Sequence, residues 1–231
     1  MERTAYVEES RFGVWFLGTW VWVHYVLRLA VADLARLAGP ACPAAPVVVD
    51  IGCGWGQSFR LLADTFAPSR LIGCDISAEV LARAAAETTA QGLQVEYHQA
   101  DSASLPLDDA SADLVFCHQT FHHLVDQPGA MREFHRVLKP GGLLLFAEST
   151  RAYIHSWIIR LLFRHPMEVQ KTAEEYLALI AAAGFEVTPE RTSYPYLWWS
   201  RTDLGIGEYW LGLKPRAGHV ETLVNVVAVK R

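Results

Sequence analysis

The sequence predicts an α/β fold in which helices cover both faces of a mostly parallel sheet. Three observations support this prediction: strand-like and helical segments alternate through the middle of the chain, a strand-like run ends in a glycine-rich turn, and the composition suits a buried core. Hydrophobic residues make up 52% of the 231 residues and charged residues 19%. A chain of this length and composition is expected to form one domain with additions to it.

The alternation of strands and helices runs from residue 47 to about residue 149. Strand-like runs lie at residues 47–51, 70–76, 94–100, 112–118 and 142–149. Helical patterns lie at residues 57–66, 78–92 and 126–138. Strands that are separated by helices are typical of parallel pairing, because a parallel connection must cross back over the sheet.

The C-terminal part departs from this alternation. A helix is expected at 171–184, where Thr172 and Glu175 have the spacing of a capping box. A strand is expected after it at 185–192, FEVTPERT, and a terminal strand at 222–231. Two stretches that follow neither period, 150–168 and 194–219, are interpreted as insertions. Long loops in compact domains are often functional.

The N-terminal segment, residues 1–46, is expected to be a hydrophobic helical region and linker that precedes the main domain at 47–231. Residues 12–27 carry no formal charge and are fewer than the roughly 20 that a membrane-spanning helix needs. We expect a helix that packs against the domain. A lid over an apolar substrate and contact with a membrane surface are the alternatives. No cleavage site follows promptly, so secretion is not expected.

Charge and cysteine content limit the classes of partner and compartment. The net charge is −5 and the sequence pI is about 6.0, which argues against a nucleic-acid-binding protein. The four cysteines are widely spaced and form no CxxC pair. Reduced thiols in a cytoplasmic protein are therefore expected, and a zinc ribbon is not.

The stretch VVVDIGCGWGQS, residues 47–58, carries the strongest functional signal. A buried strand passes through Asp50 and turns through Gly52, Gly54 and Gly56 into a helix. Glycine tolerates positive φ and lets a ligand approach the backbone, and the helix start offers free N–H groups. These features predict a pocket for a nucleotide-like ligand, although the spacing is not the dinucleotide pattern GxGxxG.

Two further aspartates follow the next strands. Asp75 ends the second strand, where an acid can bind the two hydroxyls of a ribose. Asp101 follows the third strand, where a carboxylate can accept from an amino group of a base. The carboxyl ends of parallel strands meet at one edge of the sheet, so these groups are expected beside the glycine turn.

Together with GCDIS, QADSASLPLDDASADLVFCHQTFHHL and REFHRVLKPGGLLLFAES, this stretch makes residues 47–149 resemble the class I S-adenosylmethionine-dependent methyltransferases. The chain is similar to the branch that includes ubiquinone and menaquinone C-methyltransferases and many small-molecule methyltransferases. The resemblance implies a Rossmann-like, doubly wound sheet of seven strands with an antiparallel last strand. It also implies S-adenosylmethionine as cofactor and methyl transfer as activity.

The resemblance implies roles for the residues of the glycine turn. The backbone of Gly52, Cys53 and Gly54 would lie against the methionine end of the cofactor. Asp50 and Gly56 would shape that loop. The run KPGG at 139–142 would turn the chain into the fifth strand.

Five later positions would bind the remainder of the cofactor. Asp75 would bind the ribose hydroxyls, and Ile76 would pack on the adenine. Asp101, with Ser102 beside it, would contact the adenine amino group. His118 would lie near the methionine portion or the sulfonium.

The run HQTFHH, residues 118–123, holds the candidate catalytic residues. His122 and His123, which are expected to begin the helix after the fourth strand, are candidate bases, because histidine titrates near neutral pH. Packing alone is the alternative. His118 and His122 have the spacing of a zinc HExxH motif, but Gln119 stands where that motif has its glutamate. The histidines also lie at a strand end, so no metal is expected.

The acceptor is expected to be a small hydrophobic molecule. Aromatic residues are concentrated in the two insertions: Tyr153, Trp157, Tyr194, Tyr196, Trp198, Trp199, Tyr209 and Trp210. They could equally fill the core or the seam of a homodimer. The alternatives to methyl transfer are a non-methylating enzyme that uses the same cofactor and a catalytically silent cofactor-binding subunit. Peripheral membrane contact also stays open.

Overall fold

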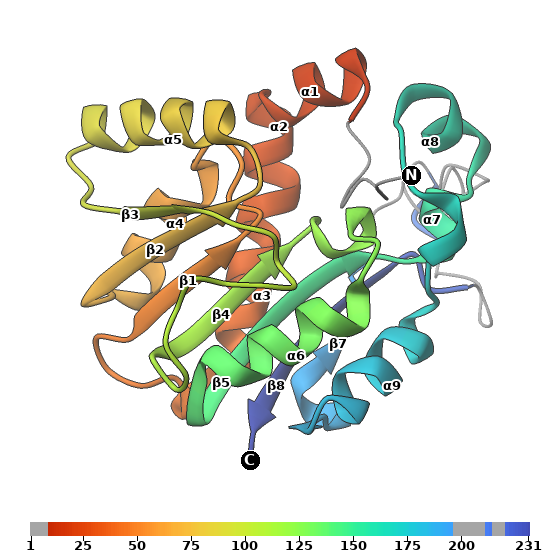
Figure 1. Ribbon diagram of the computed structural model, residues 1–231. Coiled ribbons are helices and arrows are strands. Elements are labelled where there is room, and N and C mark those ends of the chain that lie inside the picture. The colour runs from red at the N-terminus through yellow and green to blue at the C-terminus, as the bar shows by residue number, and fades with distance from the viewer. Residues whose placement is uncertain (1–8, 196–210, 214–219) are drawn as a thin grey trace, which may run out of the picture.

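The computed structural model describes residues 9–195, 211–213 and 220–231, which form a single sheet with helices on both faces (Figure 1). The strands follow the order β3-β2-β1-β4-β5-β8-β6, and β7 pairs with β8. Their bounds are β1 Val47–Ile51, β2 Arg70–Asp75, β3 Glu96–Gln99, β4 Ala112–His118, β5 Leu138–Ser149, β6 Phe185–Glu186, β7 Thr192–Ser193 and β8 Leu223–Lys230.

The pairing confirms the predicted doubly wound sheet. Strands β1 to β5 pair in parallel, and β8 pairs antiparallel with β5 from Leu143↔Val229 to Ser149↔Leu223. The expected antiparallel last strand is therefore present. The main path holds the expected seven strands, with the two-residue strand β7 as an addition. The register aligns the ends of β1 and β4, Ile51 with Cys117, which brings their following loops together.

KPGG falls at the register shift within β5: Leu138 pairs with Ala112, the next paired residue is Leu143, opposite Leu114, and Gly141 has a φ of 78°. One local expectation was wrong. The run at 185–192 is not one strand. It forms β6 and β7, separated by a 3-10 turn at Pro189–Arg191, where proline removes a ladder donor.

The helices form two layers. On one face lie α3 (Arg28–Ala38), α4 (Gln57–Phe66) and α5 (Ala78–Ala90), and on the other lie α6 (Gln127–Val137) and α9 (Ala173–Ala182) (Figure 1). Each helix layer packs on its own hydrophobic core. Phe59 is fully buried in the core under α3, α4 and α5, and Phe134 and Tyr176 are fully buried in the core under α6 and α9. The capping box of α9, Thr172 with Glu175, is confirmed.

The uncharged N-terminal run folds as a bent series of helices. Helix α1 (Arg11–Leu17) is followed by α2 (Trp20–Trp22), a π-helical turn (Val23–Leu27) and then α3. Within the described residues no single helix is long and apolar enough to cross a membrane; Arg11–Leu17 and Trp20–Ala41 meet that length and composition only jointly, across a 60° bend.

Helix α3, which follows the uncharged run, is anchored to the sheet. Within residues 12–27, for which a packed helix was expected, only Gly13, Val26 and Leu27 are buried. Leu34 is fully buried in the core beneath α3. The carboxylate of Asp33 accepts hydrogen bonds from the hydroxyl of Ser193 and from Nδ2 of Asn225, the latter at 2.9 Å. These hydrogen bonds join α3, in the N-terminal part of the chain, to β7 and β8 in its C-terminal part.

The first insertion, 150–168, contains α7 (Arg151–Ile154), α8 (Trp157–Leu162) and a 3-10 turn at Met167–Val169. It packs on α1: the rings of Phe12 and Phe163 meet edge to face at 5.6 Å. Most of the second insertion lies outside the described residues, as do five of the aromatic residues singled out above: Tyr196, Trp198, Trp199, Tyr209 and Trp210.

Leu34 and Leu29 of α3 provide a matched pair for measuring what this anchoring contributes. Leu34→Ala is expected to lower the free energy of unfolding by about 2–5 kcal/mol, because it removes a fully buried side chain. Leu29 is 51% exposed on the same helix, so Leu29→Ala should change it by about 0.5 kcal/mol or less. Urea unfolding measures both. Equal effects would show that α3 is not packed as described.

Candidate active site

The glycine turn after β1 has the backbone geometry that the sequence predicted. Gly52 and Gly54 have φ of 67° and 52°, in the left-handed region that favours glycine. A Cβ on Gly52 would collide with the side chain of Thr120, whereas a Cβ on Gly54 would meet nothing within 4 Å. The turn is therefore closely packed at Gly52 and open at Gly54.

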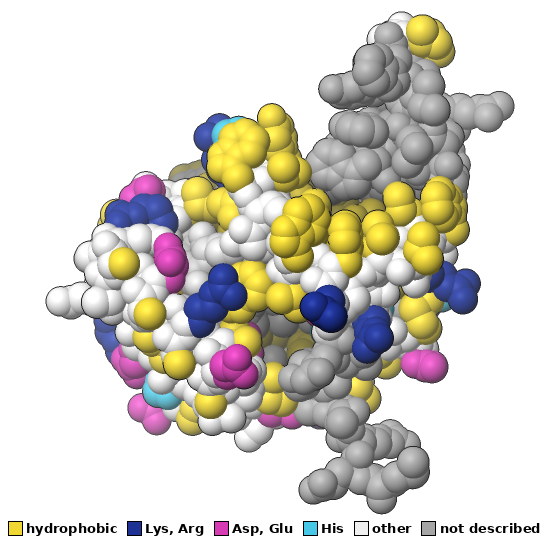
Figure 2. Space-filling view, turned by 90° about the horizontal axis from the view of Figure 1, so that it is seen from above, with side chains coloured by type: hydrophobic (Ala, Val, Ile, Leu, Met, Phe, Trp, Pro, Cys, Tyr) yellow, Lys and Arg dark blue, Asp and Glu magenta, His cyan; other side chains and the backbone are white. Residues whose placement is uncertain are grey.

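A cavity of about 630 Å³ lies at the carboxyl edge of the sheet, on the side viewed in Figure 2. Ten of the twelve predicted site residues line it: Asp50, Gly52, Cys53, Gly54, Asp75, Ile76, Asp101, Ser102, His118 and His123. Gly56 and His122 do not line it. A hollow of about 710 Å³ between α5 and β2–β3 has none of these residues in its lining, so we place the candidate site in the first cavity.

The carboxylate of Asp75 is held in place by two backbone N–H groups. One oxygen accepts from Gly54 at 3.1 Å, and the other accepts from Ser77 at 3.0 Å. Ser77 in turn caps the start of α5. Asp75 therefore links the glycine turn to the next helix. Asp101 is exposed at the cavity and accepts from the N–H of Ala103 at 2.9 Å.

Asp50 is buried, and the hydroxyl of Ser58 donates a hydrogen bond to it. Burial raises the pKa of Asp50 to about 7; the bond from Ser58 opposes this and the charge of Asp75 adds to it. Because Ser58 lies in the first turn of α4, this contact joins the end of β1 to that helix.

His118 ends β4 with its ring between Phe116 and Trp22. The ring centroids are 6.0 Å from Phe116 and 5.7 Å from Trp22. Burial, with a smaller effect from His122, lowers the pKa of His118 to about 3. The imidazole is therefore neutral at physiological pH.

The turn after β4 is organised by Glu148, a residue that the sequence analysis did not single out. Its carboxylate is fully buried on β5. One oxygen accepts from the N–H groups of Thr120 at 2.8 Å and Phe121 at 2.7 Å, and the other lies 2.6 Å from Nδ1 of His122. The sequence did contain a signal for Glu148, because a carboxylate at the end of an otherwise apolar strand needs hydrogen-bonding partners when it is buried.

His122 and His123 lie in a 3-10 turn, Phe121–His123, and not in a helix as expected. The structure places His165 beside them, with ring centroids 5.0 Å from His122 and 4.9 Å from His123. Burial, with a smaller effect from His122, lowers the pKa of His165 to about 3. His165 follows α8, and nothing in the local sequence connects it with His122.

The N-terminal helices form one wall of the cavity. Val14 and Leu17 of α1, Trp22 of α2 and Leu27 all line it. From the glycine turn, Trp55 contributes a ring on which the guanidinium of Arg83 lies at 3.9 Å. The run that was expected to pack against the domain, residues 12–27, thus covers the cavity, and the helix packed in the core is α3, which follows it.

Comparison with known proteins identifies the domain. Residues 49–146 match the family described as "Methyltransferase domain". A Mycolicibacterium smegmatis protein named a probable S-adenosylmethionine-dependent methyltransferase is 34% identical over 61% of this chain and 52% of its own length. The chain spans about half, or less, of the length of the curated relatives it matches, 38% to 52% for three of them.

Two solved structures share the fold. The partner of the Trm112 methyltransferase activator in a complex from Haloferax volcanii has a TM-score of 0.69 and 23% identity, over 94% of this chain and 95% of that one. The [4+2]-cyclase SpnF has a TM-score of 0.66 and 24% identity, over 88% and 80%. The family match and the relatives identify residues 49–146 as a class I S-adenosylmethionine-dependent methyltransferase domain.

Proposed function

We propose that the chain transfers a methyl group from S-adenosylmethionine to a small hydrophobic acceptor. One observation at the wall of the cavity carries this proposal. No atom lies within 4 Å of the Cβ position of Gly54, and its N–H donates a hydrogen bond to the carboxylate of Asp75. A glycine without a neighbour at its Cβ position leaves room for a ligand against the chain. The residues present therefore fit the cofactor of the family.

The proposed contacts follow the positions around the cavity. Asp75 would accept from the ribose hydroxyls with the lone pairs that Gly54 and Ser77 leave free. Ile76, Asp101 and Ser102, which follow on the same edge, would hold the adenine. Gly52, Cys53 and Gly54 would lie against the methionine end.

Bound S-adenosylmethionine supplies a methyl group on a positively charged sulfur, which an acceptor displaces in line. The chain's own contribution is to position the two molecules and to exclude water. Leu17 and Trp22 give the cavity an apolar wall, and the neutral ring of His118 does not repel a cation. The fixed aromatic wall also suits an apolar acceptor.

Of the two candidate bases, His123 is the one that meets the acceptor in this proposal. His123 lines the cavity, whereas His122 is 3% exposed and its Nδ1 is engaged by Glu148. His122 would act by supporting the turn that carries His123.

A non-methylating reaction on the same cofactor domain is the second candidate. It is favoured by the similarity of the fold to a protein named a [4+2]-cyclase. Product mass separates the two functions, since methylation adds one CH₂ to the acceptor.

The four cysteines are all free thiols, which supports the proposal of a cytoplasmic location. A homodimer stays a prediction.

Asp75→Asn tests the cofactor site. This variant should weaken the binding of S-adenosylhomocysteine at least 10-fold in a calorimetric titration. Hydrogen bonds to a charged group contribute about 1.5–3 kcal/mol, and 1.4 kcal/mol corresponds to a factor of ten. Asparagine keeps the size of the side chain and an oxygen for the N–H of Gly54.

Asp108→Asn is the matched control, because Asp108 is an exposed aspartate that does not line the cavity. It should bind with wild-type affinity. If Asp75→Asn bound equally well, the ribose contact would be wrong. A wild-type protein that bound neither S-adenosylmethionine nor S-adenosylhomocysteine would refute the proposed function.

We further propose that the acceptor is taken from a membrane surface. Large apolar side chains are exposed on α1 to α3 and on α8: Trp15 at 63%, Trp20 at 64%, Trp157 at 63% and Leu161 at 73%. Figure 2 shows hydrophobic side chains gathered on this side of the molecule with basic residues nearby. Tryptophan is enriched where proteins meet the lipid interface.

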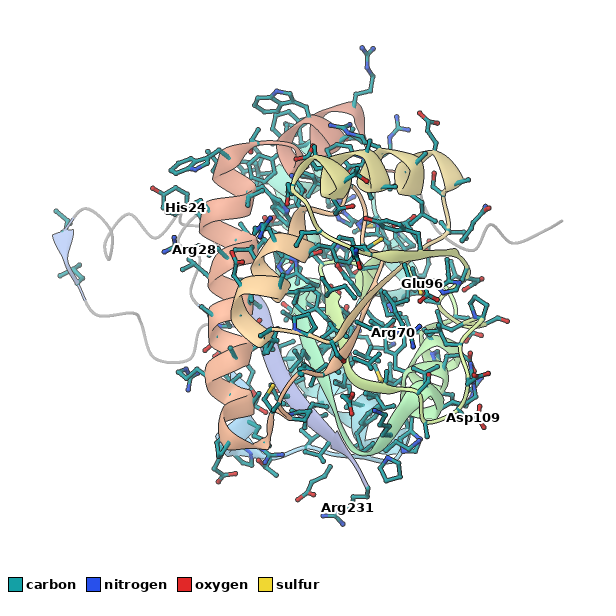
Figure 3. All side chains as sticks on the ribbon, turned by 90° about the vertical axis from the view of Figure 1, so that its left-hand side faces the viewer. His24, Arg28, Arg70, Glu96, Asp109 and Arg231 are labelled. Atoms are coloured by element: carbon teal, nitrogen blue, oxygen red, sulfur yellow. The ribbon has the colours of Figure 1, made fainter. Side chains whose placement is uncertain are left out.

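The charge beside this surface suits an anionic bilayer. Arg11, Arg28, Arg160 and Arg164 are all exposed on the same helices or directly after them. Figure 3 shows His24 and Arg28 on the outer side of the long N-terminal helix, away from the sheet. Because α1 and α2 also line the cavity, an apolar molecule could pass from the surface to the site.

Vesicle co-sedimentation tests this contact. The wild type should bind vesicles rich in phosphatidylglycerol, and replacing Trp15, Trp20 and Trp157 by serine should abolish binding. Arg28→Gln should weaken it about 5-fold, since a basic residue near an anionic surface contributes about 1 kcal/mol.

Arg70→Gln is the matched control for Arg28. Arg70 pairs with Glu96 at 2.6 Å on an edge of the sheet far from Arg28 (Figure 3). It should sediment like the wild type. Binding that is unchanged in the serine variant would exclude this surface as the lipid contact.

A further inference from the structure

Three histidine side chains from two separate segments face one another beside the cavity. His122 and His123 come from the turn after β4, and His165 follows α8. The nearest ring centroids, those of His122 and His123, are 4.3 Å apart. A potential ligand nitrogen from each histidine lies within 4.8 Å of the other two.

Glu148 gives this cluster the support that metal-binding histidines usually have. Its carboxylate holds Nδ1 of His122 at 2.6 Å, which leaves Nε2 as the ligand atom. A carboxylate that orients the ring and raises its basicity in this way is typical of histidine metal sites. The same carboxylate is fully buried and accepts from the backbone of the turn, so the ring position is fixed.

Gln170 ties the two segments of the cluster together. Its buried Nε2 donates to the carbonyl of His122 and to the carbonyl of Pro166, the residue after His165, both at 2.8 Å. The approach of His165 to His122 is therefore built into the fold and does not depend on loose side chains.

We propose that His122, His123 and His165 bind a divalent transition-metal ion. Zn²⁺ is used below for the expected geometry and for the binding test. Three neutral imidazoles with an open fourth position are the ligand pattern of catalytic zinc sites. With Zn–N bonds of about 2.0–2.1 Å, tetrahedral ligand nitrogens lie about 3.3 Å apart. Side-chain rotation would have to bring the nitrogens closer by about 1.5 Å at most.

The open position would face the acceptor, because His123 lines the cavity. In this respect the inference rests on the proposed function and deepens it. A metal ion at this place would bind the acceptor atom that receives the methyl group and favour its deprotonated form. His123 would then meet the acceptor through the metal ion that it holds.

Metal binding can be measured without any acceptor. Protein without an affinity tag, freed of metal by a chelator, is titrated with Zn²⁺ and with Co²⁺, whose visible spectrum reports its ligands. We expect one ion per chain. His165→Ala should lower the affinity roughly 100-fold or more, and Glu148→Gln should lower it about 10- to 100-fold.

His155→Ala is the matched control, because His155 is exposed and lies ten positions before His165. It should bind metal like the wild type. Circular dichroism, measured on every variant, shows that the domain is folded, and binding of S-adenosylhomocysteine reports the proposed function separately. If Glu148→Gln does not fold, the comparison of His165→Ala with His155→Ala decides.

Two results would overturn the metal site: no ion bound by the wild type, or equal affinities of His165→Ala and His155→Ala. Zinc bound by the wild type and lost in His165→Ala supports the site whether or not S-adenosylhomocysteine binds. If zinc binds in this way but S-adenosylhomocysteine does not, the proposed function fails and the metal site stands.

Discussion

The buried carboxylate of Glu148 is the interaction on which the rest of the site depends. It lies on β5, an interior strand of the sheet, with no exposure to solvent, where an unpaired charge would be strongly destabilising. It is tolerated because Thr120, Phe121 and His122 all direct hydrogen-bonding groups at it. Since these three residues are consecutive, one carboxylate fixes the path of the whole turn after β4.

The position of that turn determines the shape of the glycine turn beside it. The side chain of Thr120 occupies the space that a Cβ on Gly52 would need, and its hydroxyl lies 3.3 Å from the carbonyl oxygen of Gly52. A larger residue at position 52 would have to displace a turn that Glu148 holds in place. The turns after β1 and β4, which both line the cavity, therefore share one packed contact, made possible by the parallel register of β1 and β4.

Local patterns in the sequence were sufficient for most of the sheet and for the glycine turn and Asp75 at the edge of the cavity. The strand ending at Ile51, the glycines after it and Asp75 are all coded within short runs, so their edge of the sheet could be predicted. His165 and Glu148 could not be assigned to the site. Their partners lie 43 and 26 positions from them in the chain, at His122, and only the tertiary fold brings these residues together.

The errors in secondary structure have local physical causes. His122 and His123 were expected at the start of a helix, but Asp126 caps α6 only after them, with Pro128 in its first turn. The histidines are thereby left in a tight turn that presents both rings toward His165. The histidine cluster thus depends on the helix beginning late.

The N-terminal helices contribute both to the wall of the cavity and to the exposed apolar surface of the molecule. Two residues of α3 fix this helix: Leu34 is buried in the core, and Asp33 accepts hydrogen bonds from residues of β7 and β8. The π-helical turn Val23–Leu27 separates this anchored part from α2 and α1. Such turns often occur at functional sites, and here Leu27 ends the turn at the cavity wall. Because α1 and α2 carry both the apolar wall and the exposed tryptophans, any movement of these helices about the turn changes the cavity and the outer surface together.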